Sequence, residues 1–165
     1  ASRPALPARV ARKPGALPRG FRGCYAAGMS GLARAMWRQA RRDIEVAGAA
    51  LGNGFFEWTV FAAQQAAEKS LKAVLLAAGA PAPPLHNLDR LFDALVAAGT
   101  ATPEEQAGLK QALLALTQGW AVSRYPLAGI EMAPADLLTE ADARTALTHA
   151  TAVMDFARSR GIEAA

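Results

Sequence analysis

The sequence FFEWTVFAAQQAAEKSLKAVLL, residues 55–76, decides the fold of this chain. Apolar residues in and just after it recur at steps of four and three, the spacing of one face of an α-helix. This stripe consists of Phe56, Val60, Ala63, Ala67, Leu71, Val74 and Ala78. Polar residues lie between the stripe positions, and Glu68 precedes Lys72 by four residues, which favours an intrahelical ion pair. The pattern predicts a half-buried helix with a solvated, charged edge.

The composition extends this prediction to the whole chain. With 165 residues the chain can form one domain with a core of four or five helices. Valine and isoleucine together number only 10, and no segment alternates strictly between apolar and polar residues, so we expect an all-α fold. The single cysteine, Cys24, excludes an intramolecular disulfide and a cysteine-based zinc site. We expect no metal, no cofactor, no membrane span and a cytoplasmic location.

Start and stop signals place further helices on both sides of this segment. The Gly52-Asn53-Gly54 turn ends a preceding helix, prolines follow Gly79, and Thr102-Pro103 and Thr139 mark the starts of later helices. We expect a four- to five-helix up-and-down bundle. The first helix covers about residues 31–51, and the second contains the segment quoted above and ends at 78. Later helices cover about residues 87–98, 103–119 and 140 onward, with a loop at 121–137. Small residues of the last helix form a seam for close packing: Ala143, Ala146, Ala150, Val153 and Ala157.

The N-terminal residues 1–28 differ in composition from the rest. They contain six Lys or Arg, four prolines and no acidic residue, whereas residues 29–165 carry 12 basic and 14 acidic residues. Prolines oppose regular structure, so we separate a disordered head, 1–28, from a helical bundle, 29–165. The head has three interpretations: a basic arm that touches nucleic acid, an organelle-targeting leader, or residues that precede the true start at Met29. We favour the last.

Four short motifs together resemble one known family. The most specific is A-x-Q-Q-A-A-E-K-x-L-K-A at 62–73, followed by a proline-rich loop and His86-Asn87-Leu88. Trp37-x-x-Ala40-x-x-Asp43 precedes this block, and Arg124-Tyr125-Pro126 follows it. In this order and spacing, over about residues 33–160, the motifs resemble the HEPN domain (higher eukaryotes and prokaryotes nucleotide-binding). The resemblance implies the helical bundle expected above.

The resemblance implies two kinds of function. One branch of the superfamily contains metal-independent endoribonucleases with an R-x4-6-H motif, in which arginine binds phosphate and histidine performs acid–base cleavage. The other contains nucleotide-associated partners of minimal nucleotidyltransferases, some in toxin–antitoxin pairs. No histidine lies in the window after Arg124, where the first branch has one. We therefore expect a non-enzymatic, homodimeric partner of a minimal nucleotidyltransferase that associates with a nucleotide or RNA.

Two alternatives remain open. The chain could be an endoribonuclease toxin that uses Arg144 and His149, the one pair with R-x4-H spacing, or Arg124 with His86. Residues five apart on a helix diverge by about 140°, so the first pair would need assembly across a dimer. The second alternative is a dimeric helical scaffold without a ligand.

The candidate ligand-binding residues lie at the motifs. We expect Arg124 to contact phosphate, because a guanidinium binds phosphate oxygens in a bidentate manner. His86 either fixes its loop by bonding a backbone carbonyl or lines a groove with Arg124 and Lys69 or Lys72. For the other candidates we expect a structural role before a role in ligand binding. Tyr125 is expected to anchor its loop, and Glu68 to form an ion pair with Lys72. The three tryptophans are expected as core or interface anchors: Trp37, Trp58 and Trp120.

Overall fold

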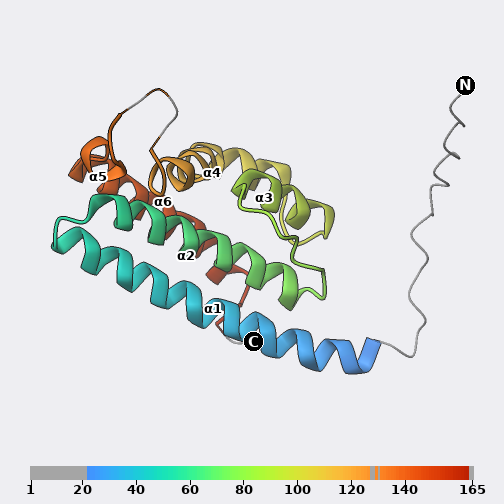
Figure 1. Ribbon diagram of the computed structural model, residues 1–165. Coiled ribbons are helices and arrows are strands. Elements are labelled where there is room, and N and C mark those ends of the chain that lie inside the picture. Colours follow the sequence, from blue (N-terminus) through green and yellow to red (C-terminus); the bar gives the residue numbers. More distant parts are fainter. Residues whose placement is uncertain (1–21, 127–128, 130, 164–165) are drawn as a thin grey trace, which may run out of the picture.

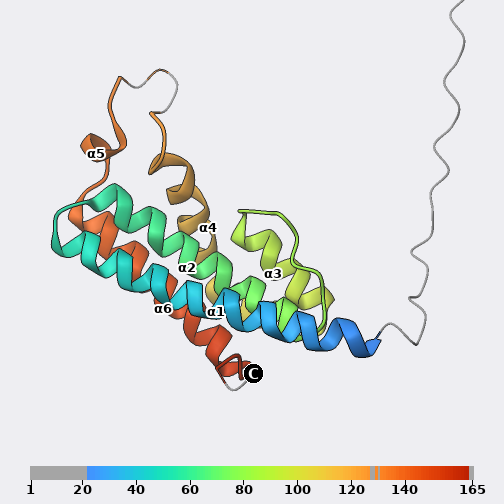
Figure 2. The same cartoon turned by 60° about the horizontal axis from the view of Figure 1, so that its bottom comes forward.

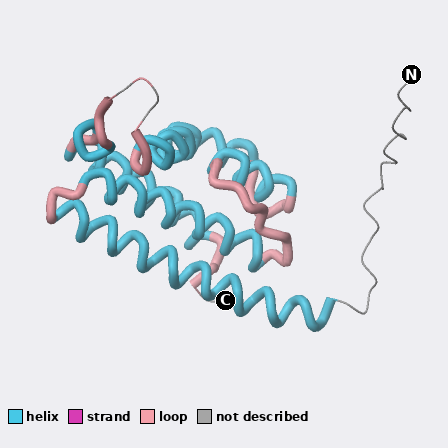
Figure 3. The backbone as a smooth tube through the Cα atoms, viewed as in Figure 1, coloured by secondary structure: helices cyan, strands magenta, loops and turns pink. Residues whose placement is uncertain are grey.

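A computed structural model describes residues 22–126, 129 and 131–163 of this chain, and this part is helical without a strand (Figures 1 and 3). The helices are α1 (Arg22–Gly52), α2 (Phe56–Ala77), α3 (Leu88–Ala97), α4 (Pro103–Val122), α5 (Pro134–Leu137) and α6 (Glu140–Ser159). The predicted all-α bundle is therefore confirmed, with five long helices and the single turn α5 inside the expected loop at 121–137. Most of the basic head, residues 1–21, lies outside the described residues.

Helix α2 is the central element of the bundle. It contacts α1, α3, α4 and α6, and α1 runs antiparallel beside it (Figures 1 and 2). Helices α3 and α4 cover the side of α2 that faces away from α1. A helix with neighbours on so many sides needs apolar residues beyond one stripe, and Leu75 and Leu76 are buried together with Leu71.

The prediction of a solvated, charged edge on α2 is wrong. Gln64 is fully buried and Glu68 is only 5% exposed, because α3, α4 and the loop before α3 cover this edge. The stripe itself is confirmed from Val60 to Val74, with Phe56 partly buried. Its last expected member, Ala78, is exposed because the helix has already ended at Ala77.

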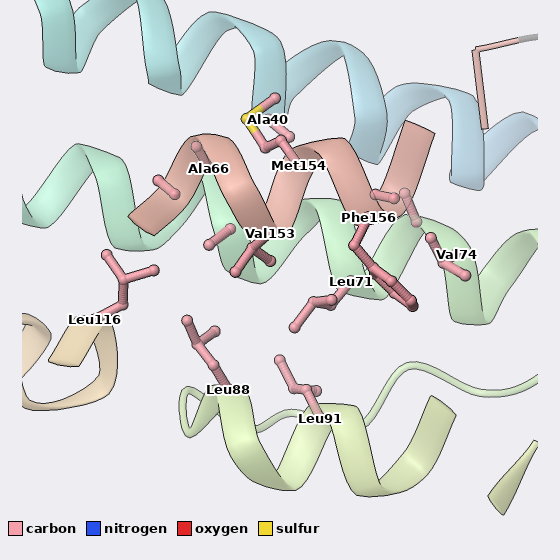
Figure 4. Packing of buried hydrophobic residues seen from close by; sticks show 14 of the residues in the cluster. Ala40, Ala66, Leu71, Val74, Leu88, Leu91, Leu116, Val153, Met154 and Phe156 are labelled. Carbon is pink, nitrogen blue, oxygen red and sulfur yellow. The ribbon is translucent and has the colours of Figure 1, made fainter. Parts of the chain in front are cut away.

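The core fills the space between α1, α2, α3, α4 and α6 (Figure 4). Leu71 of α2 lies near Leu88 and Leu91 of α3, and the Phe92 and Phe156 rings are 4.8 Å apart between centroids. The expected small-residue seam of α6 is buried, which lets this helix lie close to α2: Ala143, Ala146, Ala150, Val153 and Ala157. Burial of these side chains is the main favourable term for the fold.

Local signals set most helix ends. Thr102 and Thr139 each accept a hydrogen bond from the backbone N–H three residues later, as part of a capping box. Gly54 and Gly79 have positive φ, which glycine adopts at little cost, and they terminate α1 and α2 as expected. The exception is the start of α1, which lies at Arg22 rather than near Gly31.

Helix α4 approaches α2 closely at one glycine. A Cβ atom on Gly119 would lie 2.7 Å from Cγ1 of Val60. A larger residue fits there only if the short, stiff side chain of Val60 moves. The residues that follow Gly119 on α4 are therefore held close to α2.

Candidate functional site

Residues of α2 and of the loop before α3 form what we call the polar network: Gln64, Glu68, Lys72 and His86. The first three lie four residues apart, so they share one edge of α2. Lys72 Nζ donates to Glu68 Oε1 at 2.7 Å, which confirms the predicted ion pair, and Gln64 Nε2 donates to Glu68 Oε2 at 3.0 Å. The other Glu68 contact is His86 Nδ1, 3.1 Å from Oε2. Three polar side chains thus meet at one buried carboxylate.

Opposing effects act on the Glu68 carboxyl. Burial raises its pKa because the charged form loses water. Hydrogen bonds from Lys72, Gln64 and His86 lower the pKa and outweigh the burial, so the group titrates below its ordinary value of 4.5. Glu68 is therefore charged at neutral pH, and its charge is already compensated within the protein.

His86 connects this network to the end of α4. Its backbone carbonyl accepts a hydrogen bond from Gln64 Nε2 at 3.2 Å, which ties the loop to α2. Its imidazole lies parallel to the Trp120 ring, with 4.8 Å between centroids and 13° between planes. The expected side-chain bond from His86 to a backbone carbonyl is replaced by the carboxylate of Glu68 and this stacked ring.

Arg124 lies just beyond the end of α4, in what we call the arginine–aromatic cluster: Phe61, Trp120, Arg124 and Tyr125. Its guanidinium carbon is 5.5 Å from the ring centroid of Phe61 and 5.2 Å from those of Trp120 and Tyr125. Distances below about 6 Å indicate cation–π attraction. Within the described part of the chain, no carboxylate pairs with this guanidinium. Its cationic group is thus oriented by rings but not neutralised.

Tyr125 is not a buried loop anchor. Its side chain is 63% exposed, and its hydroxyl accepts a hydrogen bond from Arg124 Nη2 at 3.3 Å. Trp58 is 59% exposed and meets Phe61 edge-on, whereas Trp37 lies in the core as expected. Exposed rings beside a cation form a surface that can receive a flat, anionic molecule.

The structure brings most of the predicted ligand residues together. Trp120 contacts both His86 and Arg124, so the network and the cluster are continuous. Lys69 is engaged elsewhere, because its Nζ donates to Asp43 Oδ2 of α1 at 2.6 Å. The Trp37-x-x-Ala40-x-x-Asp43 motif thus supplies core residues and an ion-pair partner for α2.

Sequence reasoning did not place two aromatic residues in the site. Phe61 was not singled out, and Trp120 was expected only as a core or interface anchor. Trp120 precedes Arg124 by four residues, the spacing at which side chains meet on a helix, and this signal could have connected them. The contacts of Phe61 and His86 arise only when distant elements pack.

The pair with R-x4-H spacing is not assembled within the chain. Arg144 Nε donates to Glu140 Oε1 at 2.8 Å. His149 instead lines a cavity of about 250 Å³ between α2, α4 and α6, and its buried Nδ1 has no hydrogen-bond partner among the described residues. Arg144 does not line that cavity. Among the described residues, no three His, Cys, Asp or Glu side chains gather as metal ligands, and no helix has the length and apolarity to cross a membrane.

Comparisons with known proteins agree with this architecture. Residues 33–160 match the HEPN domain. The crystal structure of TT1696 from Thermus thermophilus is 33% identical, with a TM-score of 0.70 over 78% of this chain and 97% of that chain. ST0689, an archaeal HEPN homologue, is 28% identical, with a TM-score of 0.62 over 77% of this chain and 95% of that one. No curated protein matches. The family match covers most of the chain, which therefore belongs to the HEPN domain family.

Proposed function

We propose that this HEPN protein is a non-enzymatic, nucleotide-associated partner of a minimal nucleotidyltransferase, acting in the cytoplasm as a homodimer in a toxin–antitoxin pair. The observation that carries the proposal is the arginine–aromatic cluster. Arg124 offers a guanidinium that no carboxylate of the described chain neutralises, and it lies among rings of which Tyr125 is the most exposed.

The chemistry of this cluster suits a nucleotide. A guanidinium donates parallel hydrogen bonds to two phosphate oxygens, and such charge-assisted bonds are about twice as strong as neutral ones. An exposed ring beside the phosphate contact offers a stacking surface for a base, and Tyr125 supplies one. We assign the phosphate to Arg124 and the base to Tyr125.

The other predicted ligand residues have a supporting role in this proposal. Glu68 and Lys72 neutralise each other at 2.7 Å, with side chains only 6% and 12% exposed, so neither offers a free charge to a ligand. The carboxylate of Glu68 also contacts His86, whose imidazole in turn stacks on Trp120. Lys69 belongs to the contact between α1 and α2.

We propose that the protein is not catalytic because of the sequence that follows Arg124. Residues 125–131 contain no histidine to act as the acid or base that the endoribonuclease branch of the family uses. One observation favours the endoribonuclease alternative, because His86 and Arg124 contact the same indole of Trp120. A metal-free RNA cleavage assay separates the two functions. We expect no cleavage, and cleavage abolished by His86→Ala would establish the alternative.

Nucleotide binding tests the site itself. Isothermal calorimetry with mono-, di- and triphosphates should show binding that Arg124→Ala weakens by about 1.5–3 kcal/mol, the usual worth of a charge-assisted contact. Arg144→Ala removes another exposed guanidinium, on α6, and should leave the affinity unchanged. Equal losses in both variants would show unspecific attraction, and no binding at all would favour the scaffold without a ligand.

The partner requires a separate experiment. The purified chain and a minimal nucleotidyltransferase encoded beside it should elute together from a size-exclusion column. Light scattering on the chain alone should give twice its mass if it is a homodimer. Separate elution of the two proteins would contradict the proposed partnership and leave nucleotide binding to be judged on its own.

A further inference from the structure

One flank of α1 carries a row of arginines that the Arg124 site does not use. Successive residues of an α-helix are about 100° apart, so positions 34, 38, 41 and 45 fall within a band about 60° wide. Arg38, Arg41 and Arg42 line, together with Glu45, a shallow surface hollow of about 230 Å³.

The positive charge of this hollow is only partly compensated. Arg42 pairs with Glu45 at 3.0 Å, but within the described residues no carboxylate pairs with Arg38 or Arg41. Basic and acidic residues are also distributed unevenly along the sequence. The first 42 residues contain ten Lys or Arg and no Asp or Glu, whereas the other 123 contain eight basic and 14 acidic residues, a net charge of −6. Such segregation is typical of a surface that meets a polyanion.

The neighbours of the arginines indicate what kind of polyanion fits. Beyond Glu45 the same flank continues with exposed Gly48 and Gly52, so it offers no large apolar side chain to bury. A protein interface has an apolar or aromatic centre, and a helix that lies on a membrane needs an apolar face. Leu32 and Val46, the large exposed apolar residues among the described side chains of α1, lie about four turns apart and form no such face.

We propose that the flank of α1 formed by Arg38, Arg41 and Arg42 binds the phosphate backbone of a nucleic acid without reading its sequence. Arginines attract phosphates through charge-assisted hydrogen bonds, and backbone contacts of this kind carry no base specificity. The surface is separate from the Arg124 site because α2 lies between α1 and α4 (Figure 1). The inference therefore does not depend on the nucleotide proposed for that site.

The test is a salt titration of nucleic-acid binding by the full chain. Fluorescence anisotropy with a labelled single-stranded RNA and with a labelled DNA duplex measures affinity between about 50 and 300 mM salt. The double variant Arg38→Gln/Arg41→Gln removes two phosphate contacts. For single strands each contact contributes about 0.7 to the slope of log affinity against log salt. We expect the slope to fall by about 1.4 and the affinity to fall roughly 25-fold at 0.1 M salt.

A charge-matched control makes the result specific. Arg90→Gln/Arg144→Gln removes two exposed arginines, 73% and 66% exposed, from α3 and α6 and should change the slope little. Thermal melting followed by circular dichroism verifies that both double variants fold. Comparison of the affinities for the RNA and for the DNA duplex shows which phosphate backbone the flank binds more tightly.

Several outcomes would overturn the proposal. A wild-type chain that binds neither nucleic acid, or equal losses in the two double variants, would show that the arginine row is not a binding surface. Vesicles with anionic lipid provide the third arm. Vesicle binding that Arg38→Gln/Arg41→Gln abolishes, with nucleic-acid binding unchanged, would assign the flank to a membrane surface instead.

Discussion

The polar network and the arginine–aromatic cluster share the ring of Trp120 but differ in what they leave unsatisfied. In the network, Glu68 is 5% exposed and its carboxylate has three hydrogen-bonding partners. In the cluster, Arg124 faces rings rather than a carboxylate, and Tyr125 is 63% exposed. The difference indicates that the residues predicted to bind a ligand have two different roles. A buried charge with all its hydrogen bonds made stabilises the structure, whereas a charge without a carboxylate partner can bind a ligand.

The largest expected effect comes from the network. Glu68→Ala leaves the ammonium of Lys72 buried without its partner, so the free energy of unfolding should fall by about 3–5 kcal/mol in a denaturant titration. Glu140→Ala is the control, because it removes another i, i+4 pair whose side chains are exposed, and its effect should stay within about 1 kcal/mol. Similar effects in both variants would contradict the structural role that we assign to the buried Glu68.

A second prediction concerns the apolar side of the same helix. Leu71 is fully buried, so Leu71→Ala should lower the free energy of unfolding by about 2–5 kcal/mol through lost burial and a cavity. Leu114→Ala makes the same change at a side chain that is 41% exposed, and we expect less than about 1 kcal/mol there. Chemical denaturation of both variants measures the difference. Two small losses would mean that α2 is rotated from the orientation described, and two large losses would mean that Leu114 is buried.

The close contact between α4 and α2 gives a third prediction. Gly119→Ala places a Cβ atom against the stiff, buried side chain of Val60 and should destabilise by about 1–3 kcal/mol, as overpacking does. Gly108→Ala on the same helix meets no neighbour within 4 Å and should stabilise by up to about 1 kcal/mol through helix propensity. Thermal unfolding should show a lower midpoint for Gly119→Ala and a higher midpoint for Gly108→Ala than for the unchanged chain. A stabilised Gly119→Ala would show that the two helices separate easily at this point.

A fourth prediction concerns how the stability of the polar network depends on pH. The folded pKa of Glu68 lies below its ordinary value of 4.5, so its stabilisation is present above that pH and is lost as the pH falls through the folded pKa. We expect a smaller loss than that caused by Glu68→Ala. Glu68→Gln should flatten this acid limb in denaturation measured above, near and below the ordinary pKa of Glu68. An unchanged limb in Glu68→Gln would assign the acid sensitivity to other carboxyls.

The smallest expected effect lies in the cluster. Arg124→Ala should change the free energy of unfolding by less than about 1 kcal/mol, because exposed cation–π contacts contribute little. Tyr125→Phe removes one exposed hydroxyl and should have a smaller effect still. Denaturation curves provide the measurement. A loss in Arg124→Ala as large as that in Glu68→Ala would make the cluster a structural element like the network.

Sequence reasoning predicted the bundle well because its signals are local. The steps of three and four in α2 and the capping residues Thr102 and Thr139 act within one or two turns of helix. The last helix was predicted for the same reason, down to its buried seam of small residues. The start of α1 was placed too late, since no Ser, Thr, Asp or Asn directly precedes Arg22 in the sequence.

The site was only partly predictable. The motifs drew attention to Glu68, Lys72, His86 and Arg124, and the spacing of Glu68 and Lys72 gave their ion pair correctly. The assumption that charged residues lie at a solvated edge failed for Glu68, because burial depends on which helices pack over that edge. Tyr125 was expected to pack inward, yet its ring remains open.

Local sequence patterns were enough to predict the five long helices, their order, most of their ends and the resemblance to the HEPN family. Only the tertiary structure decided that His86 stacks on Trp120 and that Arg124 reaches Phe61. These contacts join residues 34 and 63 positions apart, and no local pattern encodes such a pairing. It arises when α2, α4 and the loop before α3 bury their apolar faces together, which fixes where the polar groups at their edges meet.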